Sequence, residues 1–194
     1  PQELFLRTLY HRLQAMPFFV RRQIRQASDS YHPWMESRLQ ETPPNTFSTQ
    51  PRVTFFVAVK PGEEADLART LDSLLALRLT NWEAVPVREG EGWLNIHPDF
   101  SGNPRVHETL TASEVRNAWY PIARSGFLVF CAAGDVFLDS TLNYFYQALE
   151  AHPEADIYYC DCEYQPEGST ENKPFFKPAA DSPELLCSIN YLSR

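Results

Sequence analysis

The sequence has no long apolar run and comparatively little positive charge. No stretch approaches the roughly 18 apolar residues that a membrane-spanning helix needs, and the amino-terminal residues lack a signal-peptide pattern. Its 17 lysines and arginines are outnumbered by 25 acidic residues, which gives a formal net charge of -8. Nucleic-acid binding needs a basic surface. We therefore expect a cytoplasmic protein that does not bind nucleic acid.

Cysteine is also scarce, with four residues in 194. The cysteines form no C-x-x-C pair and no zinc-like spacing with the five histidines, so the sequence carries no zinc signal. Cys131, Cys160 and Cys162 fall in or just after stretches that are expected to be core strands. The interpretation is that they are buried, reduced thiols, which suits a reducing cytosol.

Four short stretches carry the apolar, β-branched and aromatic residues that are typical of buried strands. They are Arg52–Val59, Trp82–Val87, Phe127–Cys131 and Asp156–Cys160. Because helical patterns separate them, the chain predicts an α/β fold with a mostly parallel sheet flanked by helices. Phe127–Cys131 is expected to be its central strand, and Asp156–Cys160 is expected to close it. In such a sheet, ligands bind at the carboxyl ends of the strands.

Apolar residues at spacings near 3.6 predict the helices between these strands. Helices are expected over Glu63–Leu77, over Ala112–Arg124 and after Asp139, whose side chain can cap the last of them. That last helix is expected to bury Leu142, Phe145 and Leu149. The aromatic residues expected in the core are Trp82, Phe145 and Tyr158.

The glycines and prolines of residues 88–111 predict little regular structure there beyond a short strand at Trp93–Ile96. Gly168–Asn172 is interpreted as a turn between two short strands.

Residues 1–50 are expected to form a helical arm and linker in front of a domain over 51–194. Apolar residues near helical spacing predict a helix over 2–26, interrupted at Pro17, and Tyr31–Gln40 predicts a second, short helix. Glu41–Pro51 reads as a linker. The apolar stripe of the arm needs a partner, and three partners stay open: its own domain, a second copy or another subunit, or an anionic membrane surface at the inner face. Five arginines would favour the membrane: Arg7, Arg12, Arg21, Arg22 and Arg25.

Several motifs resemble those of family 2 glycosyltransferases. His152–Asp161 resembles H-P-x-A-D-x-x-Y-S-D, and Pro174–Pro178 gives P-F-F-K-P, followed by a match to S-P-D-L-L-x-x-N-Y that ends at Tyr191. Thr70–Val87 resembles T-L-D-S-L-L-A-Q-T-Y-P-N-W-E-V-x-V-V. The resemblance is strongest to members that build bacterial surface polysaccharides such as O-antigen. It implies a Rossmann-like GT-A domain that transfers sugar from a nucleotide sugar.

The resemblance also implies a nucleotide-sugar site, although its usual residues are altered here. Lys60 replaces an aromatic residue of the base pocket, and Arg88 and Glu89 replace a pair of carboxylates. Asp135 matches the last acid of D-x-D-D and is the candidate ligand of a divalent metal, Mg²⁺ or Mn²⁺. Asp161 matches part of a further acidic element and is expected within reach of the same space. Lys60 and Arg88 could instead hold a diphosphate without metal.

The catalytic base is not assigned, because in this family it lies in an acceptor half beyond the last matched motif. Pro1 stands where a methionine would begin a protein, so a piece of a longer chain is one expectation. The leading hypothesis is the donor-binding half of a larger or paired glycosyltransferase. The alternative is a catalytically silent relative that acts as a scaffold or assembly module. A receiver or flavodoxin-like domain would share the sheet but leaves the family motifs unexplained.

Overall fold

A computed structural model describes residues 43–91, 94, 96–115, 126–160, 162–166 and 168–175, together with Pro33 and Ser37. The chain divides into two compact units, one of residues 43–158 and the other of 1–42 with 159–194. Pro33 and Ser37 are both helical, and the rest of the predicted arm lies outside the described residues. So do Asp161, Cys187 and the last motifs of the chain. Among the described residues, no helix has the length and apolar character needed to cross a bilayer.

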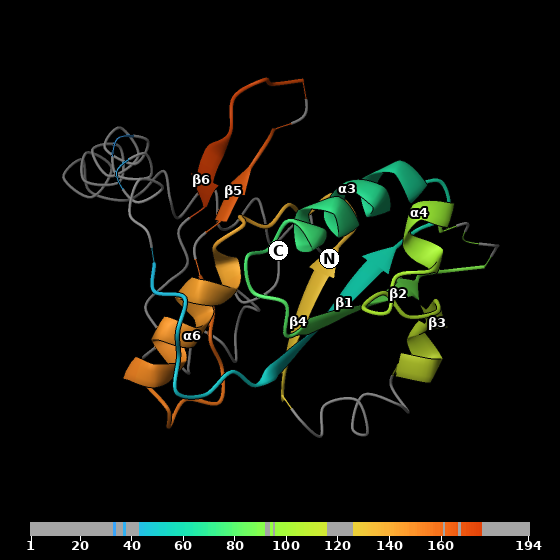
Figure 1. Cartoon of the computed structure of the whole chain (residues 1–194). Helices are drawn as coiled ribbons and strands as arrows, with labels where there is room; N and C mark the ends of the chain where they lie inside the picture. Colours follow the sequence, from blue (N-terminus) through green and yellow to red (C-terminus); the bar gives the residue numbers. More distant parts are fainter. Residues whose placement is uncertain are drawn as a thin grey trace, which may run out of the picture. The chain divides into compact units, whose positions relative to one another are not determined.

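A four-stranded parallel sheet forms the centre of the 43–158 unit (Figure 1). Its strands are β1 (Arg52–Val59), β2 (Trp82–Arg88), β3 (Leu110–Thr111) and β4 (Gly126–Ala132). They lie in the order β3-β2-β1-β4, and every pairing is parallel. The α/β class is therefore confirmed, as are three predicted strands. The expectation that Phe127–Cys131 is central is wrong for the described sheet, because β1 is an inner strand and β4 lies at the end of the order.

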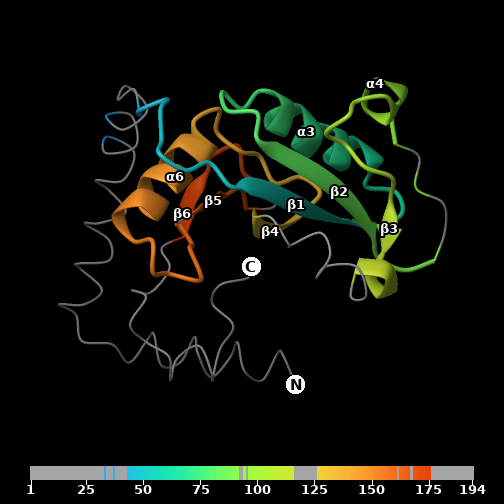
Figure 2. The same ribbon diagram turned by 60° about the horizontal axis from the view of Figure 1, so that its bottom comes forward.

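Two helices, α3 (Glu64–Leu75) and α6 (Thr141–Ala151), pack on the same face of this sheet (Figure 2). Apolar side chains from α3, α6, β1 and β2 form one continuous core there. Its fully buried members include Leu71, Val57 and Tyr146, each 0% exposed. The leucine spacing predicts that α3 buries Leu67, Leu71, Leu74 and Leu75. The first three are buried, and Leu75 is partly buried against the core. The helix is shorter than predicted at both ends.

The opposite face of the sheet carries a smaller apolar cluster centred on Phe56, Val85 and Val87. Helical residues 112–115 cover part of it through Val115, and the rest of the helix predicted there lies outside the described residues. Phe130 of β4 stacks on Phe56 with ring centroids 5.6 Å apart but remains 72% exposed. A short helix, α4 (Pro98–Ser101), and β3 lie in the segment for which almost no regular structure was predicted.

The start of α6 differs from the prediction. Asp139 does not cap the helix, because its carboxylate pairs with Arg78 Nε at 2.8 Å. Tyr146 is the fully buried aromatic residue of the helix, whereas Phe145 is half-buried. Phe145 still packs against the core, with its ring centroid 5.1 Å from that of Phe127 and 5.5 Å from that of Tyr158. Trp82 is buried as predicted, at 2% exposure.

The strand predicted over Asp156–Cys160 is absent from the described residues, none of which pairs there with another strand. Ile157 of this segment is 62% exposed, whereas Tyr158, which was expected in the core, is partly buried against it. The hydroxyl of Tyr158 donates to the carbonyl of His152 at 2.5 Å, which ties this segment back to the end of α6 instead. Within the second unit, β5 (Cys162–Tyr164) and β6 (Lys173–Phe175) pair antiparallel. The predicted turn between two short strands is thus confirmed, with Gly168 at φ 73°.

The thiols do not share one environment. Burial, with a contribution from the charge of Asp135, raises the pKa of Cys131 to about 12. Cys162 is partly buried, but Cys160 is exposed, which corrects the expectation that all three are buried.

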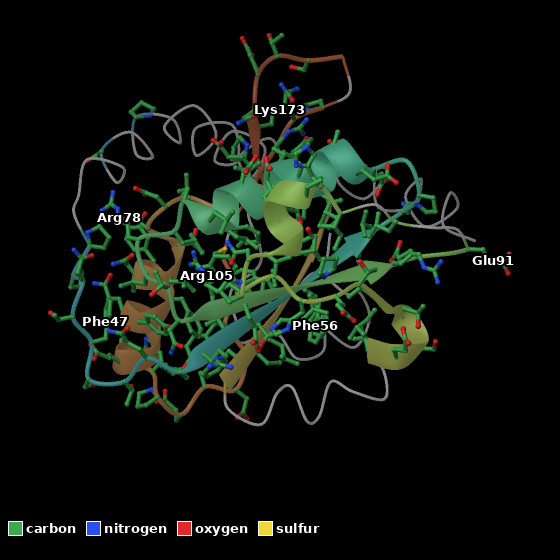
Figure 3. All side chains as sticks on the ribbon, turned by 45° about the vertical axis from the view of Figure 1, so that its right-hand side comes forward. Phe47, Phe56, Arg78, Glu91, Arg105 and Lys173 are labelled. Atoms are coloured by element: carbon green, nitrogen blue, oxygen red, sulfur yellow. The ribbon has the colours of Figure 1, made fainter. Side chains whose placement is uncertain are left out.

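Residues 43–51, predicted as part of a linker, form a strap that α6 holds in place (Figure 2). The buried side chain of Asn143 donates to the carbonyl of Pro44 at 2.9 Å and to Asn45 Oδ1 at 2.8 Å. At the other end of the strap, the hydroxyl of Tyr146 donates to the carbonyl of Pro51 at 2.8 Å. Phe47, labelled in Figure 3, lies against the Tyr146 ring, with centroids 5.6 Å apart. The strap therefore packs as part of the 43–158 unit.

Candidate functional site

The carboxyl ends of β1, β2 and β4 lie side by side, because these strands are parallel and in register. Ala58 of β1 pairs with Val87 on one side and with Ala132 on the other. Arg88 ends β2, and Lys60, Glu89 and Asp135 follow the ends of β1, β2 and β4. The structure therefore brings these four candidate residues to one edge of the sheet. Asp161, the fifth, lies outside the described residues.

Asp135 closes the turn in which it lies. Its backbone N–H donates to the carbonyl of Ala132 at 3.1 Å, and its Oδ2 accepts from the backbone N–H of Ala132 at 2.9 Å. Gly134, at φ 97°, supplies the left-handed residue that such a tight turn needs. Because Oδ2 is used in this way, Oδ1 is the carboxylate oxygen that remains for a ligand. Asp135 can therefore coordinate a metal through one oxygen, with its orientation fixed by Ala132.

The turn between β1 and α3 is closed by two acids at the start of the helix. Oε2 of Glu63 accepts from the backbone N–H of Lys60 at 3.0 Å, and Oε1 of Glu64 accepts from that of Gly62 at 3.4 Å. In many doubly wound proteins, helix N–H groups at this place bind phosphate. Here the two carboxylates bond instead to N–H groups of the turn before the helix, and α3 has no side-chain cap. Lys60, whose side chain is exposed, is the cation that this turn offers to an anion.

Arg88 at the end of β2 lies close to a second helix start. Glu114 accepts hydrogen bonds from the backbone N–H and the hydroxyl of Thr111, at 2.6 and 2.7 Å, and its own N–H points to that hydroxyl at 3.3 Å. This reciprocal pattern is a capping box. The hydrogen bonds from Thr111, together with the charge of Arg88, lower the pKa of Glu114. The charge of Arg88 thus already acts on an acid of the fold, Glu114. Glu89, beside Arg88, is exposed.

Among the described residues around these strand ends, acids outnumber bases. The acids are Glu63, Glu64, Asp66, Glu89, Glu114 and Asp135, and the bases are Lys60, Arg69 and Arg88. A diphosphate would meet net repulsion here unless a cation accompanied it. No cluster of three metal-ligating side chains occurs among the described residues. Magnesium keeps much of its water shell and uses substrate phosphates as ligands, so a single carboxylate oxygen fits a shared site of that kind.

A second polar cluster, which the sequence analysis missed, surrounds Glu83 of β2. Its Oε1 accepts from the Thr54 hydroxyl at 2.8 Å, and its Oε2 lies 2.9 Å from His107 Nε2 and 3.5 Å from an Arg52 guanidinium nitrogen. The side chain is only 14% exposed. A glutamate inside the apolar run of a strand is the signal that could have drawn attention to it. The cluster ties β1, β2 and the segment before β3 together, near the amino ends of β1 and β2.

An open hollow of about 750 Å³ lies beside the strap, at the amino end of β1. It is lined by strap residues 48–51 and by Leu149, Glu150 and Pro153. Its acid, Glu150, is already bonded to the N–H and the hydroxyl of Ser48, at 2.6 and 2.7 Å. The hollow lies at the amino ends of the strands, whereas Asp135 follows the carboxyl end of β4.

Comparison with known proteins gives one similarity. No family model matches the chain. A protein of Sinorhizobium fredii (strain NBRC 101917 / NGR234), named "Uncharacterized protein y4gI", is 26% identical over 162 residues. The match covers 74% of this chain and 17% of that protein, so the chain spans less than a fifth of the relative's length. That name states no activity.

Proposed function

We propose that this chain is the nucleotide-sugar-binding half of a GT-A-type glycosyltransferase that acts in the synthesis of a surface polysaccharide. The observation that carries the proposal is the Asp135 turn, which follows β4 at the edge where the carboxyl ends of β1 and β2 also lie. That edge is where parallel α/β sheets bind their ligands. The motifs that resemble family 2 glycosyltransferases support the same assignment.

The chemistry would be displacement of a nucleoside diphosphate from a sugar by an acceptor hydroxyl. Negative charge grows on the diphosphate as the bond to the sugar breaks, and a divalent cation offsets it. Asp135 would hold Mg²⁺ or Mn²⁺ through Oδ1, with water and phosphate oxygens as further ligands. The exposed side chain of Lys60 can add positive charge near the phosphates. The acceptor and its catalytic base are left to residues that are not assigned here.

A second candidate function is a catalytically silent scaffold or assembly module of the same family. Two features favour it: Asp135 already bonds to its own turn, and the amino terminus of α3 carries its own acids. In both places the carboxylates have hydrogen-bond partners within the fold, without a ligand.

Calorimetric titration of the full chain with UDP-, GDP- and dTDP-sugars, with and without Mn²⁺, tests the proposal. We expect one nucleotide sugar to bind only when Mn²⁺ is present. Asp135→Asn should abolish that binding, because the amide can still accept from Ala132 but lacks the charge that holds a metal. Asp99→Asn, a change at an exposed aspartate of α4, is the matched control and should bind normally. Absence of binding across the panel would favour the scaffold.

A further inference from the structure

Two hydroxyl side chains of α3 hold the segment that follows β4. The backbone N–H of Gly134 donates to Thr70 Oγ1 at 2.9 Å and also approaches the carbonyl of Asp66 at 3.2 Å. Three residues further on, the backbone N–H of Phe137 donates to Ser73 Oγ at 3.1 Å. The two amides flank Asp135 on either side. The contacts join α3 to residues that are 64 positions away in the sequence.

Each hydroxyl is itself oriented by the helix. Thr70 donates to the carbonyl of Asp66 at 3.2 Å, and Ser73 donates to the carbonyl of Thr70 at 2.7 Å. A hydroxyl has one proton and two lone pairs. Once its proton is directed to a helix carbonyl, a lone pair is free to accept an amide from outside the helix. Thr70 is 0% exposed, so its contact with Gly134 is shielded from water.

These residues are unusual choices for the interior of a helix. Hydroxyl side chains that bond back to helix carbonyls do not stabilise the helix and often bend it slightly. The buried surface of α3 is otherwise made by leucines. A valine at position 70 would fill the same volume without a polar atom. The polar contact with Gly134 is what the threonine adds.

We infer that Thr70 and Ser73 are positioning residues for Asp135. They fix the backbone on both sides of Asp135, while Ala132 fixes Oδ2, and together these contacts set the direction in which Oδ1 is presented. The ring of Phe137 packs on Phe55 with centroids 5.0 Å apart, which anchors the far end of the turn in the core. The inference rests on the proposed function, since Asp135 is the residue proposed to hold the metal.

We call the hydrogen bonds from the Gly134 and Phe137 amides to Thr70 and Ser73 the clamp. Amide hydrogen exchange tests whether the clamp orders the turn, independently of any ligand. Thr70→Val should raise the exchange rate at Gly134 by about tenfold or more, while β1 amides keep their protection. Thr70→Ser should restore slow exchange, and Ser73→Ala should affect Phe137 in the same way. Ser101→Ala is the matched control, because Ser101 also donates to a carbonyl three residues earlier, at 3.1 Å, on the separate helix α4. Unchanged exchange at Gly134, or an equal rise throughout β1, would overturn the inference.

Titration of the same variants with Mn²⁺ and UDP, GDP or dTDP tests the link to binding. Thr70→Val should lower the affinity for whichever nucleotide binds wild type by roughly fivefold to tenfold, the size expected for one lost hydrogen bond. Thr70→Ser should restore that affinity. Full affinity in Thr70→Val, despite fast exchange at Gly134, would overturn the positioning role. If wild type binds none of the three, the proposed function fails and the ligand role of the clamp fails with it. The exchange result would still decide whether the clamp orders the turn.

Discussion

Glu83 and His107 form a close pair across the edge of the sheet, with 2.9 Å between Oε2 and Nε2. Burial raises the pKa of Glu83, but the hydrogen bonds from His107 and Thr54 and the charges of His107 and Arg52 lower it by more. The pKa therefore falls below its ordinary value of 4.5. Because the pKa is lower in the folded state than in the unfolded chain, the ionised carboxylate stabilises the fold fully above that ordinary value. This contribution is lost as the pH falls through the lowered value.

The first prediction follows from the lowered pKa of Glu83. Glu83→Gln should lower the melting temperature at pH 7, and its difference from wild type should shrink as the pH falls below the ordinary glutamate pKa. Melting curves from pH 7 to about pH 3 measure both effects. Glu108→Gln, at an exposed neighbour of His107, is the control and should follow wild type throughout. A gap that stays constant over this range would mean that the charge of Glu83 does not stabilise the fold.

A second prediction concerns Gly126 at the first pair of the β1–β4 ladder, opposite Arg52. A Cβ at this position would overlap the carbonyl oxygen of Arg52, and both belong to paired strands that cannot easily move. Gly126→Ala should destabilise the domain by about 1–3 kcal/mol, as overpacking does. Gly102→Ala, with nothing near its Cβ, should change stability by less than about 0.5 kcal/mol. Urea unfolding of both variants measures the difference, and equal effects would contradict the β1–β4 register.

The strap leads to a third prediction. Tyr146→Phe removes the hydroxyl that bonds to the carbonyl of Pro51 and should cost about 1 kcal/mol. Tyr158→Phe removes a similar bond, to the carbonyl of His152, but an exposed one that water can replace, so its cost should be smaller. Chemical denaturation compares the two. Burial raises the pKa of Tyr146 to about 12, so ultraviolet titration of wild type should contain a late-ionising tyrosine that Tyr146→Phe removes. Equal costs for the two variants would place Tyr146 in contact with water.

A fourth prediction concerns Phe145, which contacts the rings of Phe127, Tyr146 and Tyr158. Phe145→Ala should cost about 3 kcal/mol, near the low end for buried phenylalanines because the side chain is half-buried. Phe145→Leu keeps most of the apolar volume and should cost less than half as much. Thermal and urea unfolding measure these costs. Unchanged stability of the alanine variant would show that these ring contacts do not hold α6.

The parts of the fold that could be predicted are those with a dense local pattern. RVTFFVAV gave β1 with its observed bounds, and the leucine spacing of α3 gave its buried face. The strap could not be predicted, because its prolines, threonines and serine are typical of a linker. Its contacts with Asn143 join residues 98 and 99 positions apart, which no local pattern reports. The strand at Asp156–Cys160 failed because its apolar residues do not lie on one buried face.

The candidate site, like the fold, could be predicted only in part. The parallel topology alone predicts that Lys60, Arg88 and Asp135 lie at one edge of the sheet. Whether each side chain is available depends on single hydrogen bonds, such as that between Asp135 and Ala132. The spacing of residues in the sequence does not predict which of these hydrogen bonds form. Nor does the sequence show that Glu63 and Glu64 bond to the turn before α3.

The position of β1 within the sheet has a consequence for how the chain folds. β1 reaches β2 across α3 alone, but it reaches β4 only across a stretch that also holds β2, α4 and β3. Closing the longer loop costs more entropy, so the ladder between β1 and β2 should form first. Before β4 pairs with β1, the N–H and carbonyl groups along one edge of β1 are unpaired, and such an edge can pair with another chain. The yield of refolding should therefore fall as protein concentration rises, since two β1 edges compete with β4 for the same partner.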